Sequence, residues 1–133
     1  MKEDTILKVL PWDVRSIIQK EKLEFEYLQE IRLREGKPLI FLYHDTEVIP
    51  GAKARQPYLV TKDNIREMLE YISNYSLYAC EQEMRQGFIT IEGGHRVGLS
   101  GQAIMENGKV KNLKYISSVN IRVAHEMIAV SYT

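Results

Sequence analysis

Residues 85–104 read RQGFITIEGGHRVGLSGQAI, and two strand-forming runs in this stretch flank a pair of glycines. The first run covers residues 88–91. The second begins at Arg96 and places Val97 and Leu99 at every second position. Glycine adopts positive φ at little steric cost, which a tight connection between antiparallel strands requires. We therefore predict a β-hairpin that turns at Gly93 and Gly94.

A phosphate-binding loop is the alternative interpretation of these glycines, and two observations argue against it. Such a loop opens a helix, whose first N–H groups point at the anion. Here the residues after the glycines alternate like a strand, and no segment matches the pattern G-x-x-x-x-G-K-[ST]. Further along the second run, Gly98 and Gly101 are typical of a β-bulge or a close backbone approach.

Period-two alternation also occurs outside this hairpin. In residues 28–34 it directs Ile31 and Leu33 inward and Arg32 and Arg34 outward, which predicts a strand. A turn at 35–38 follows, and further strands are predicted at 39–43, 47–49, 96–105 and 118–124. The Asn-Gly pair within 106–109 is typical of a two-residue hairpin turn, and residues 50–57, bracketed by prolines, predict a loop.

Helical spacing appears in two regions. A helix that starts at Pro11 has apolar residues at helical spacing, namely Trp12, Val14, Ile17 and Ile18. A longer helix is capped by the hydroxyl of Thr61, and its apolar face consists of Ile65, Met68, Leu69 and Ile72. We expect residues 74–76 to interrupt it, and a short helix over 77–86 to end at Gly87. These elements predict an α+β fold with a mainly antiparallel sheet and helices packed on one side.

Length, charge balance and cysteine content limit the kinds of protein that this chain can be. The chain has 133 residues, which suits a single domain over residues 1–133. Its 18 basic side chains are balanced by 18 acidic ones, which argues against a dominant electrostatic interaction with DNA or an acidic membrane. A single cysteine, Cys80, forms no internal disulfide, and the N-terminus has no signal-peptide pattern, so we expect a cytoplasmic protein.

Few residues suggest a chemical site. The histidines at 44, 95 and 125 are far apart and lack partners at ligand spacing, so we predict no metal site, and no catalytic residues can be nominated. The tyrosines at 71, 75 and 78 either form a base-stacking platform or a stripe on one helix face.

Five arginines lie in or beside strongly patterned elements: Arg32, Arg34, Arg85, Arg96 and Arg122. Ion pairing with the abundant glutamates is one interpretation of these residues. Phosphate recognition is the other, because the planar guanidinium donates hydrogen bonds in a geometry that matches a phosphate. Spacing alone does not distinguish the two.

Several motifs resemble the stage III sporulation protein AA family of endospore-forming bacteria. They run in order along the chain, at residues 28–34 (LQEIRLR) with 36–39 (GKPL), 72–79 (ISNYSLYA), 85–98 (RQGFITIEGGHRVG) and 120–124 (NIRVA). That family is similar to the hexameric ATPases of type II and type IV secretion systems. The match covers the chain from about Leu7 to Ala124 and corresponds to the family's N-terminal domain.

The resemblance implies a regulatory and assembly domain of a motor for the channel between mother cell and forespore. An ATPase core with a phosphate-binding loop is expected downstream and absent from this chain, so we expect a truncated polypeptide that does not hydrolyse ATP by itself. For the longer protein the resemblance implies ATP and Mg²⁺, a homo-hexamer and membrane partners from the sporulation channel. It also implies a cytoplasmic position in the mother cell, peripheral at the membrane that faces the forespore.

The same resemblance gives roles to the arginines. Short matches at residues 94–97 and 120–123 imply that Arg96 and Arg122 contact nucleotide phosphates held by the core. Arg32, Arg34 and Arg85 are candidates for an interface. Two alternatives remain open: a nucleic-acid-binding module that uses Arg96, Arg85 and the tyrosines, which the neutral net charge disfavours, and a purely structural adaptor.

Overall fold

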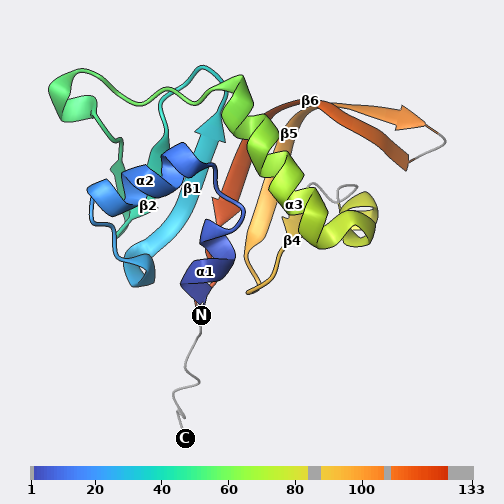
Figure 1. Ribbon diagram of the computed structural model, residues 1–133, viewed down its shortest axis with the longest axis horizontal. Helices are drawn as coiled ribbons and strands as arrows, with labels where there is room; N and C mark the ends of the chain where they lie inside the picture. Colours follow the sequence, from blue (N-terminus) through green and yellow to red (C-terminus); the bar gives the residue numbers. More distant parts are fainter. Residues whose placement is uncertain (1, 84–87, 107–108, 126–133) are drawn as a thin grey trace, which may run out of the picture.

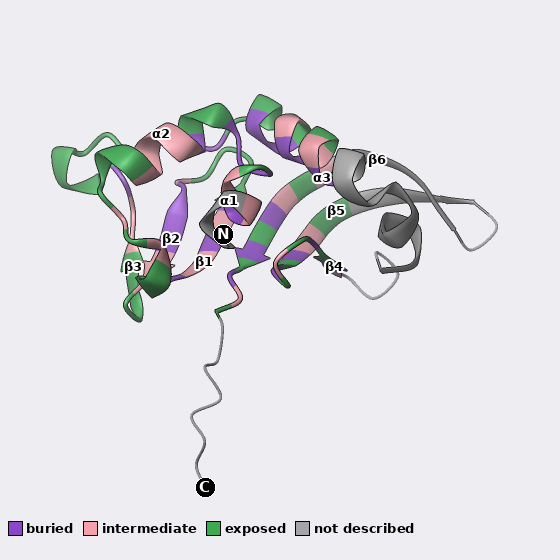
Figure 2. Cartoon of the chain, turned by 60° about the horizontal axis from the view of Figure 1, so that its bottom comes forward, coloured by how far each residue is buried: buried purple, intermediate pink, exposed green. Residues whose placement is uncertain are grey.

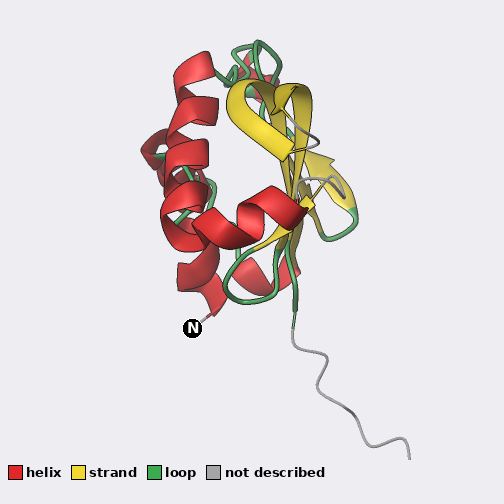
Figure 3. Ribbon diagram, turned by 90° about the vertical axis from the view of Figure 1, so that its right-hand side faces the viewer, coloured by secondary structure: helices red, strands yellow, loops and turns green. Residues whose placement is uncertain are grey.

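The computed structural model describes the backbone of residues 2–83, 88–106 and 109–125, and the side chains of residues 5–72, 88–101 and 116–125. Its main feature is a six-stranded antiparallel sheet with the strand order β3-β2-β1-β6-β5-β4. Helices α1, α2 and α3 cover one face of this sheet (Figures 1 and 3). The α+β prediction, with helices on one side of an antiparallel sheet, is confirmed.

The elements follow one another in a simple order. The helices are α1 (Lys2–Leu7), α2 (Trp12–Lys20) and α3 (Lys62–Glu83), with short 3₁₀ turns η1 (Phe25–Tyr27) and η2 (Ala52–Ala54). The strands are β1 (Leu28–Arg34), β2 (Ile40–Tyr43), β3 (Thr46–Val48), β4 (Phe88–Thr90), β5 (Arg96–Glu106) and β6 (Lys109–Arg122). No helix in these described stretches is both long and apolar enough to cross a membrane.

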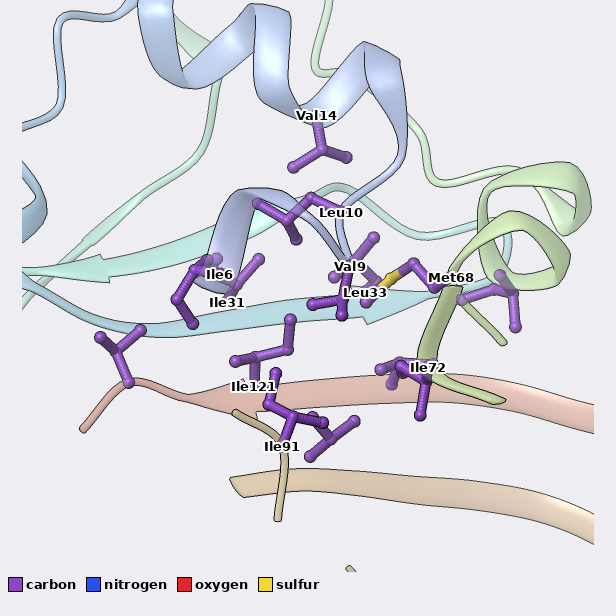
Figure 4. Packing of buried hydrophobic residues seen from close by; sticks show 14 of the residues in the cluster. Ile6, Val9, Leu10, Val14, Ile31, Leu33, Met68, Ile72, Ile91 and Ile121 are labelled. Carbon is purple, nitrogen blue, oxygen red and sulfur yellow. The ribbon is translucent and has the colours of Figure 1, made fainter. Parts of the chain in front are cut away.

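Pairing of β1 with β6 joins the two halves of the chain into one sheet. Ile31 lies opposite Ile121, and Leu33 lies opposite Val119, so the inward residues of both strands meet on one face. Over these strands lie Ile6 of α1, Leu10 of the connection between α1 and α2, and Val14 of α2, and α3 adds Met68 and Ile72 (Figure 4). Burial of this apolar surface is the main source of stability, because each large side chain removed from water contributes about 1.5–3 kcal/mol.

Most predicted elements are confirmed. Leu28–Arg34 is a strand with the predicted inward and outward residues, and α2 begins directly after Pro11. Thr61 caps α3 as predicted, because its hydroxyl accepts the N–H of Asn64 at 3.1 Å. Trp12 belongs to α2 as expected, but its side chain is 68% exposed and lies outside the core.

Two predictions about element boundaries are wrong. Helix α3 continues through residues 74–76 without interruption, because Asn, Tyr and Ser are mediocre helix formers but neither Gly nor Pro is present to break the backbone ladder. Strand β6 begins at Lys109 rather than near residue 118, because β5 extends to Glu106 and supplies a partner for the whole stretch. Gly87, the predicted end of the second helix, lies outside the described residues.

The glycine turn matches its prediction. Gly93 has φ = 92° and Gly94 has φ = 83°, and the turn connects β4 to β5. The predicted bulge occurs at Gly101, where φ is 143° and the register shifts after Ser100. Gly98 instead sits in a regular part of the ladder. The predicted turn residues Asn107 and Gly108 lie outside the described residues, so this turn remains a prediction; on either side of them, Glu106 of β5 pairs with Lys109 of β6.

Candidate functional site

The face of the sheet that the helices do not cover carries the polar side chains. Alternation between buried and exposed residues is visible along β5 and β6 in Figure 2. We call this surface the open face. One row of cross-strand partners crosses it from β3 to β4, and we call this row the arginine row: Glu47, Leu42, Glu30, Arg122, Arg96 and Thr90.

Arg96 and Arg122 are direct neighbours in this row. Their Cα atoms are register partners in β5 and β6, and both residues are exposed. Two separate sequence motifs predicted these two residues, and the fold brings them together. The Arg96 guanidinium carbon lies 4.8 Å from the centre of the Phe88 ring on β4, a cation–π contact that orients this side chain along the sheet.

Arg122 has an acidic neighbour on its other side. Glu30 on β1 is its register partner there, and the Glu30 side chain is only 13% exposed. Burial by itself raises the pKa of the Glu30 carboxyl. Hydrogen bonds from Arg32 and Asn120 outweigh burial, and the charges of Arg32 and Arg122 add to them, so the pKa lies below its ordinary value. Glu30 is therefore a fixed negative charge beside the arginine pair.

Arg32 belongs to an ion-pair network within the chain. Its Nε lies 2.8 Å from Oε1 of Glu30, and its NH1 nitrogen lies 3.5 Å from Oε1 of Glu47. Because Glu47 is on β3, the network spans β2. Ile40 of β2 is only 9% exposed although it points to the open face, and we attribute this burial to the side chains that bridge over the strand. Arg32 is thus committed to contacts inside the domain.

The other predicted arginines are placed differently. Arg34 is exposed on the open face opposite Ser118, four residues further along β1 than Glu30. Arg85 lies outside the described residues, so the interface predicted for Arg32, Arg34 and Arg85 remains a prediction. Tyr71 donates a hydrogen bond to Glu67 within α3. The side chains of the tyrosines at 75 and 78 lie outside the described set.

His95 has a structural role that the sequence did not predict. Its side chain is fully buried: Nδ1 accepts the N–H of Ala124 at 2.9 Å, and Nε2 lies 2.8 Å from Oγ1 of Thr5. An acceptor at Nδ1 fixes the neutral tautomer with its proton on Nε2, so Nε2 donates to Thr5. A signal was present, because His95 shares the period-two phase of the inward residues Val97 and Leu99.

The three histidines do not form a metal site. His44 stacks on Tyr27 with ring centroids 4.1 Å apart, and Nε2 of His125 lies 2.7 Å from the carbonyl oxygen of Leu28. Phe25 contacts both His95 and His125 with its ring. Among the described residues, no three His, Cys, Asp or Glu side chains are arranged to hold a metal ion.

The chain is similar in sequence to proteins of one known family. The sequence profile of the family described as "Sporulation stage III, protein AA" matches residues 1–132. Stage III sporulation protein AA of Bacillus subtilis (strain 168) is 34% identical over 127 residues, and the match covers 95% of this chain but only 39% of that relative. No solved structure matches the chain. The profile match and the identity together show that the chain belongs to the stage III sporulation protein AA family.

Proposed function

We propose that this chain is a regulatory and assembly domain that acts in sporulation, within a longer protein that hydrolyses ATP. The family and the Bacillus subtilis relative, both named for sporulation, support the process. The resemblance to secretion ATPases supports the mechanism. The single structural observation that carries the proposal is the exposed pair Arg96 and Arg122, which the register of β5 and β6 places side by side.

The pair is suited to a phosphate group. Cross-strand partners have Cα atoms about 4.5–5.5 Å apart, so two guanidinium groups can reach one anion. Like charges in such positions repel each other, and a phosphate bound between them replaces repulsion with charge-assisted hydrogen bonds. A rigid sheet that presents both groups responds to the charge that changes on hydrolysis, so the position of the domain follows the nucleotide state.

The remaining parts of the proposal concern the longer protein. ATP and Mg²⁺ bind to an ATPase core, and this domain contacts the nucleotide from outside that core. Six copies form a ring, and membrane proteins of the channel between mother cell and forespore are its partners. The domain itself supplies no catalytic residue and works at the cytoplasmic surface of the mother-cell membrane.

Alanine variants of the longer protein test the proposal. We expect Arg96→Ala and Arg122→Ala each to weaken nucleotide affinity about tenfold, the effect of losing a charge-assisted contact worth about 1.4 kcal/mol. Arg34→Ala is the matched control, because it removes an exposed arginine from the same face about 13 Å away along the strand. Unchanged ATP affinity and turnover in both test variants contradict the proposal.

A second candidate function is favoured by the contact between Arg96 and Phe88. An arginine beside an aromatic ring on an open sheet face also suits the bases and phosphates of a single-stranded nucleic acid. Oligonucleotide binding by the chain, with affinity that falls steeply as salt rises, supports this candidate. Absence of binding at low salt removes it.

A further inference from the structure

Three segments of the chain meet at the buried ring of His95. One is α1, whose Thr5 hydroxyl oxygen accepts a hydrogen bond from the Nε2–H, and another is the segment after β6, whose Ala124 N–H donates to Nδ1. The third is the glycine turn that His95 itself ends, where the Ile91 N–H donates to the His95 carbonyl. The two ring contacts occupy both nitrogens in the only arrangement that a neutral imidazole permits.

The absence of a side chain at Gly93 provides the space for the contact between Thr5 and His95. A Cβ atom at Gly93 would lie 2.5 Å from Oγ1 of Thr5 and 2.8 Å from Nε2 of His95, which is too close for either atom. Glycine is therefore required at position 93 for space as well as for its positive φ. It lets α1 approach the turn closely enough for the hydroxyl of Thr5 to reach the imidazole.

The position of this contact along the ladder connects it to the arginine pair. Arg96 opposite Arg122 is the last cross-strand pair at this end of β5 and β6, and His95 and Ala124 lie directly beyond it. On the β1 side, the Val123 N–H donates to the Gln29 carbonyl. The chain beyond Arg122 is thus fixed on one side by β1 and on the other by the His95 ring.

We infer that His95 is a positioning residue, which holds residues 123–125 against the glycine turn and so sets how Arg96 and Arg122 face the part of the protein that follows. The functional half of this inference rests on the proposed function, whereas the anchoring of Ala124 does not. His95 itself contacts no nucleotide. It acts indirectly, because its contacts fix the direction of the backbone after β6 and at the start of β5.

Amide hydrogen exchange in the 133-residue chain tests the anchoring. Thr5→Val removes the hydroxyl with little change in shape, and Thr5→Ser retains the hydroxyl as the rescue variant. We expect exchange at the Ala124 amide to rise at least about tenfold in Thr5→Val and to stay near the wild-type rate in Thr5→Ser. Exchange in the β1–β6 ladder, at Ile121 for example, stays unchanged. An unchanged Ala124 rate in Thr5→Val and in His95→Asn overturns the anchoring.

Nucleotide affinity of the longer protein tests the functional half. Thr61→Ala is the control for general destabilisation, because it weakens the cap of α3 far from the turn. We expect Thr5→Val to weaken affinity about threefold or more and Thr61→Ala to leave it unchanged. Equal affinities for Thr5→Val and wild type, while Arg96→Ala still weakens binding, overturn this inference and leave the proposed function intact. If the Arg96→Ala and Arg122→Ala variants also bind nucleotide with normal affinity, the proposed function is wrong. The exchange rate of the Ala124 amide then tests only the anchoring by His95.

Discussion

Arg96 and Arg122 lie directly opposite each other in β5 and β6, and among the described side chains no carboxylate lies within 4.0 Å of either. Two like charges in this position disfavour folding of the free domain. We expect a double-mutant cycle with Arg96→Gln and Arg122→Gln to give an unfavourable coupling of about 0.2–1 kcal/mol at low salt. Urea unfolding followed by circular dichroism measures it.

Salt supplies the control for this prediction. Exposed charges are screened at high ionic strength, so the coupling should shrink toward zero in about 1 M salt, where the Debye length is about 3 Å. A favourable coupling, or one that does not change with salt, would show that the two side chains are held apart or bridged by another group. An added phosphate-containing ligand that reverses the sign of the coupling would support an anion site between them.

Glu30 makes the stability of the domain depend on pH in the acid range. Its folded-state pKa is below the ordinary value of 4.5, so the unfolded chain takes up the proton first as the pH falls. The stabilisation is fully present above that ordinary value and is lost as the pH falls through the folded-state pKa. We expect Glu30→Gln to destabilise the domain by about 1.5 kcal/mol at pH 7, the lower end of the range for a hydrogen bond to a charged group.

The diagnostic result is the difference between wild type and Glu30→Gln across pH. Urea midpoints should differ clearly at pH 7 and approach each other as the pH falls through the folded-state pKa of Glu30, because the protonated carboxyl is then uncharged like the amide. Glu47→Gln is the matched control: this side chain is 55% exposed and shares only Arg32 with Glu30. A Glu30→Gln deficit that does not shrink at any point as the pH is lowered from 7 would assign the effect to packing rather than charge.

Two adjacent glycines separate the cost of backbone strain from the cost of a blocked contact. Gly93 and Gly94 both have positive φ, so alanine is strained at either position, at about 1 kcal/mol. Only at Gly93 does the new Cβ also collide, with Thr5 and His95; at Gly94 its nearest neighbour is the Ala124 Cβ at 3.8 Å. We expect Gly93→Ala to cost at least about 1 kcal/mol more than Gly94→Ala. Equal unfolding free energies would contradict the close approach of α1 to the turn.

Local patterns in the sequence predicted most of the fold because one face of the sheet is buried. The alternation in residues 28–34 and the phase of Val97 and Leu99 follow from that burial, and they determined the strands correctly. The same phase would have placed His95 inside. We considered His95 only as a possible metal ligand, because histidine commonly binds metals, and not as a buried residue that makes hydrogen bonds.

Local sequence patterns could not predict that the two candidate arginines pair with each other. Starting from Glu106 opposite Lys109, a regular ladder would place Val119 opposite Arg96. The observed partner is Arg122, three residues further, because the register shifts at three places between Ser100 and Met105. Gly101 indicated one of these irregularities, but the sequence contains no comparable signal for the other two. The site therefore depends on bulges that only the folded sheet reveals.

The start of α3 supplies a last prediction, about two side chains that cap each other. Thr61 Oγ1 accepts the Asn64 N–H at 3.1 Å, and Asn64 Oδ1 accepts the Thr61 N–H at 2.9 Å and the Tyr58 hydroxyl at 2.8 Å. Thr61→Ala should cost about 1 kcal/mol in unfolding free energy, the usual value of a lost cap. Asn64→Ala should cost about 2 kcal/mol or more, because Asn64 is 3% exposed, its loss leaves the Thr61 N–H without its acceptor, and the Tyr58 hydroxyl retains only Asp13, at 3.2 Å. Urea unfolding compares the two variants, and a smaller loss for Asn64→Ala would mean that the Thr61 hydroxyl alone secures this helix end.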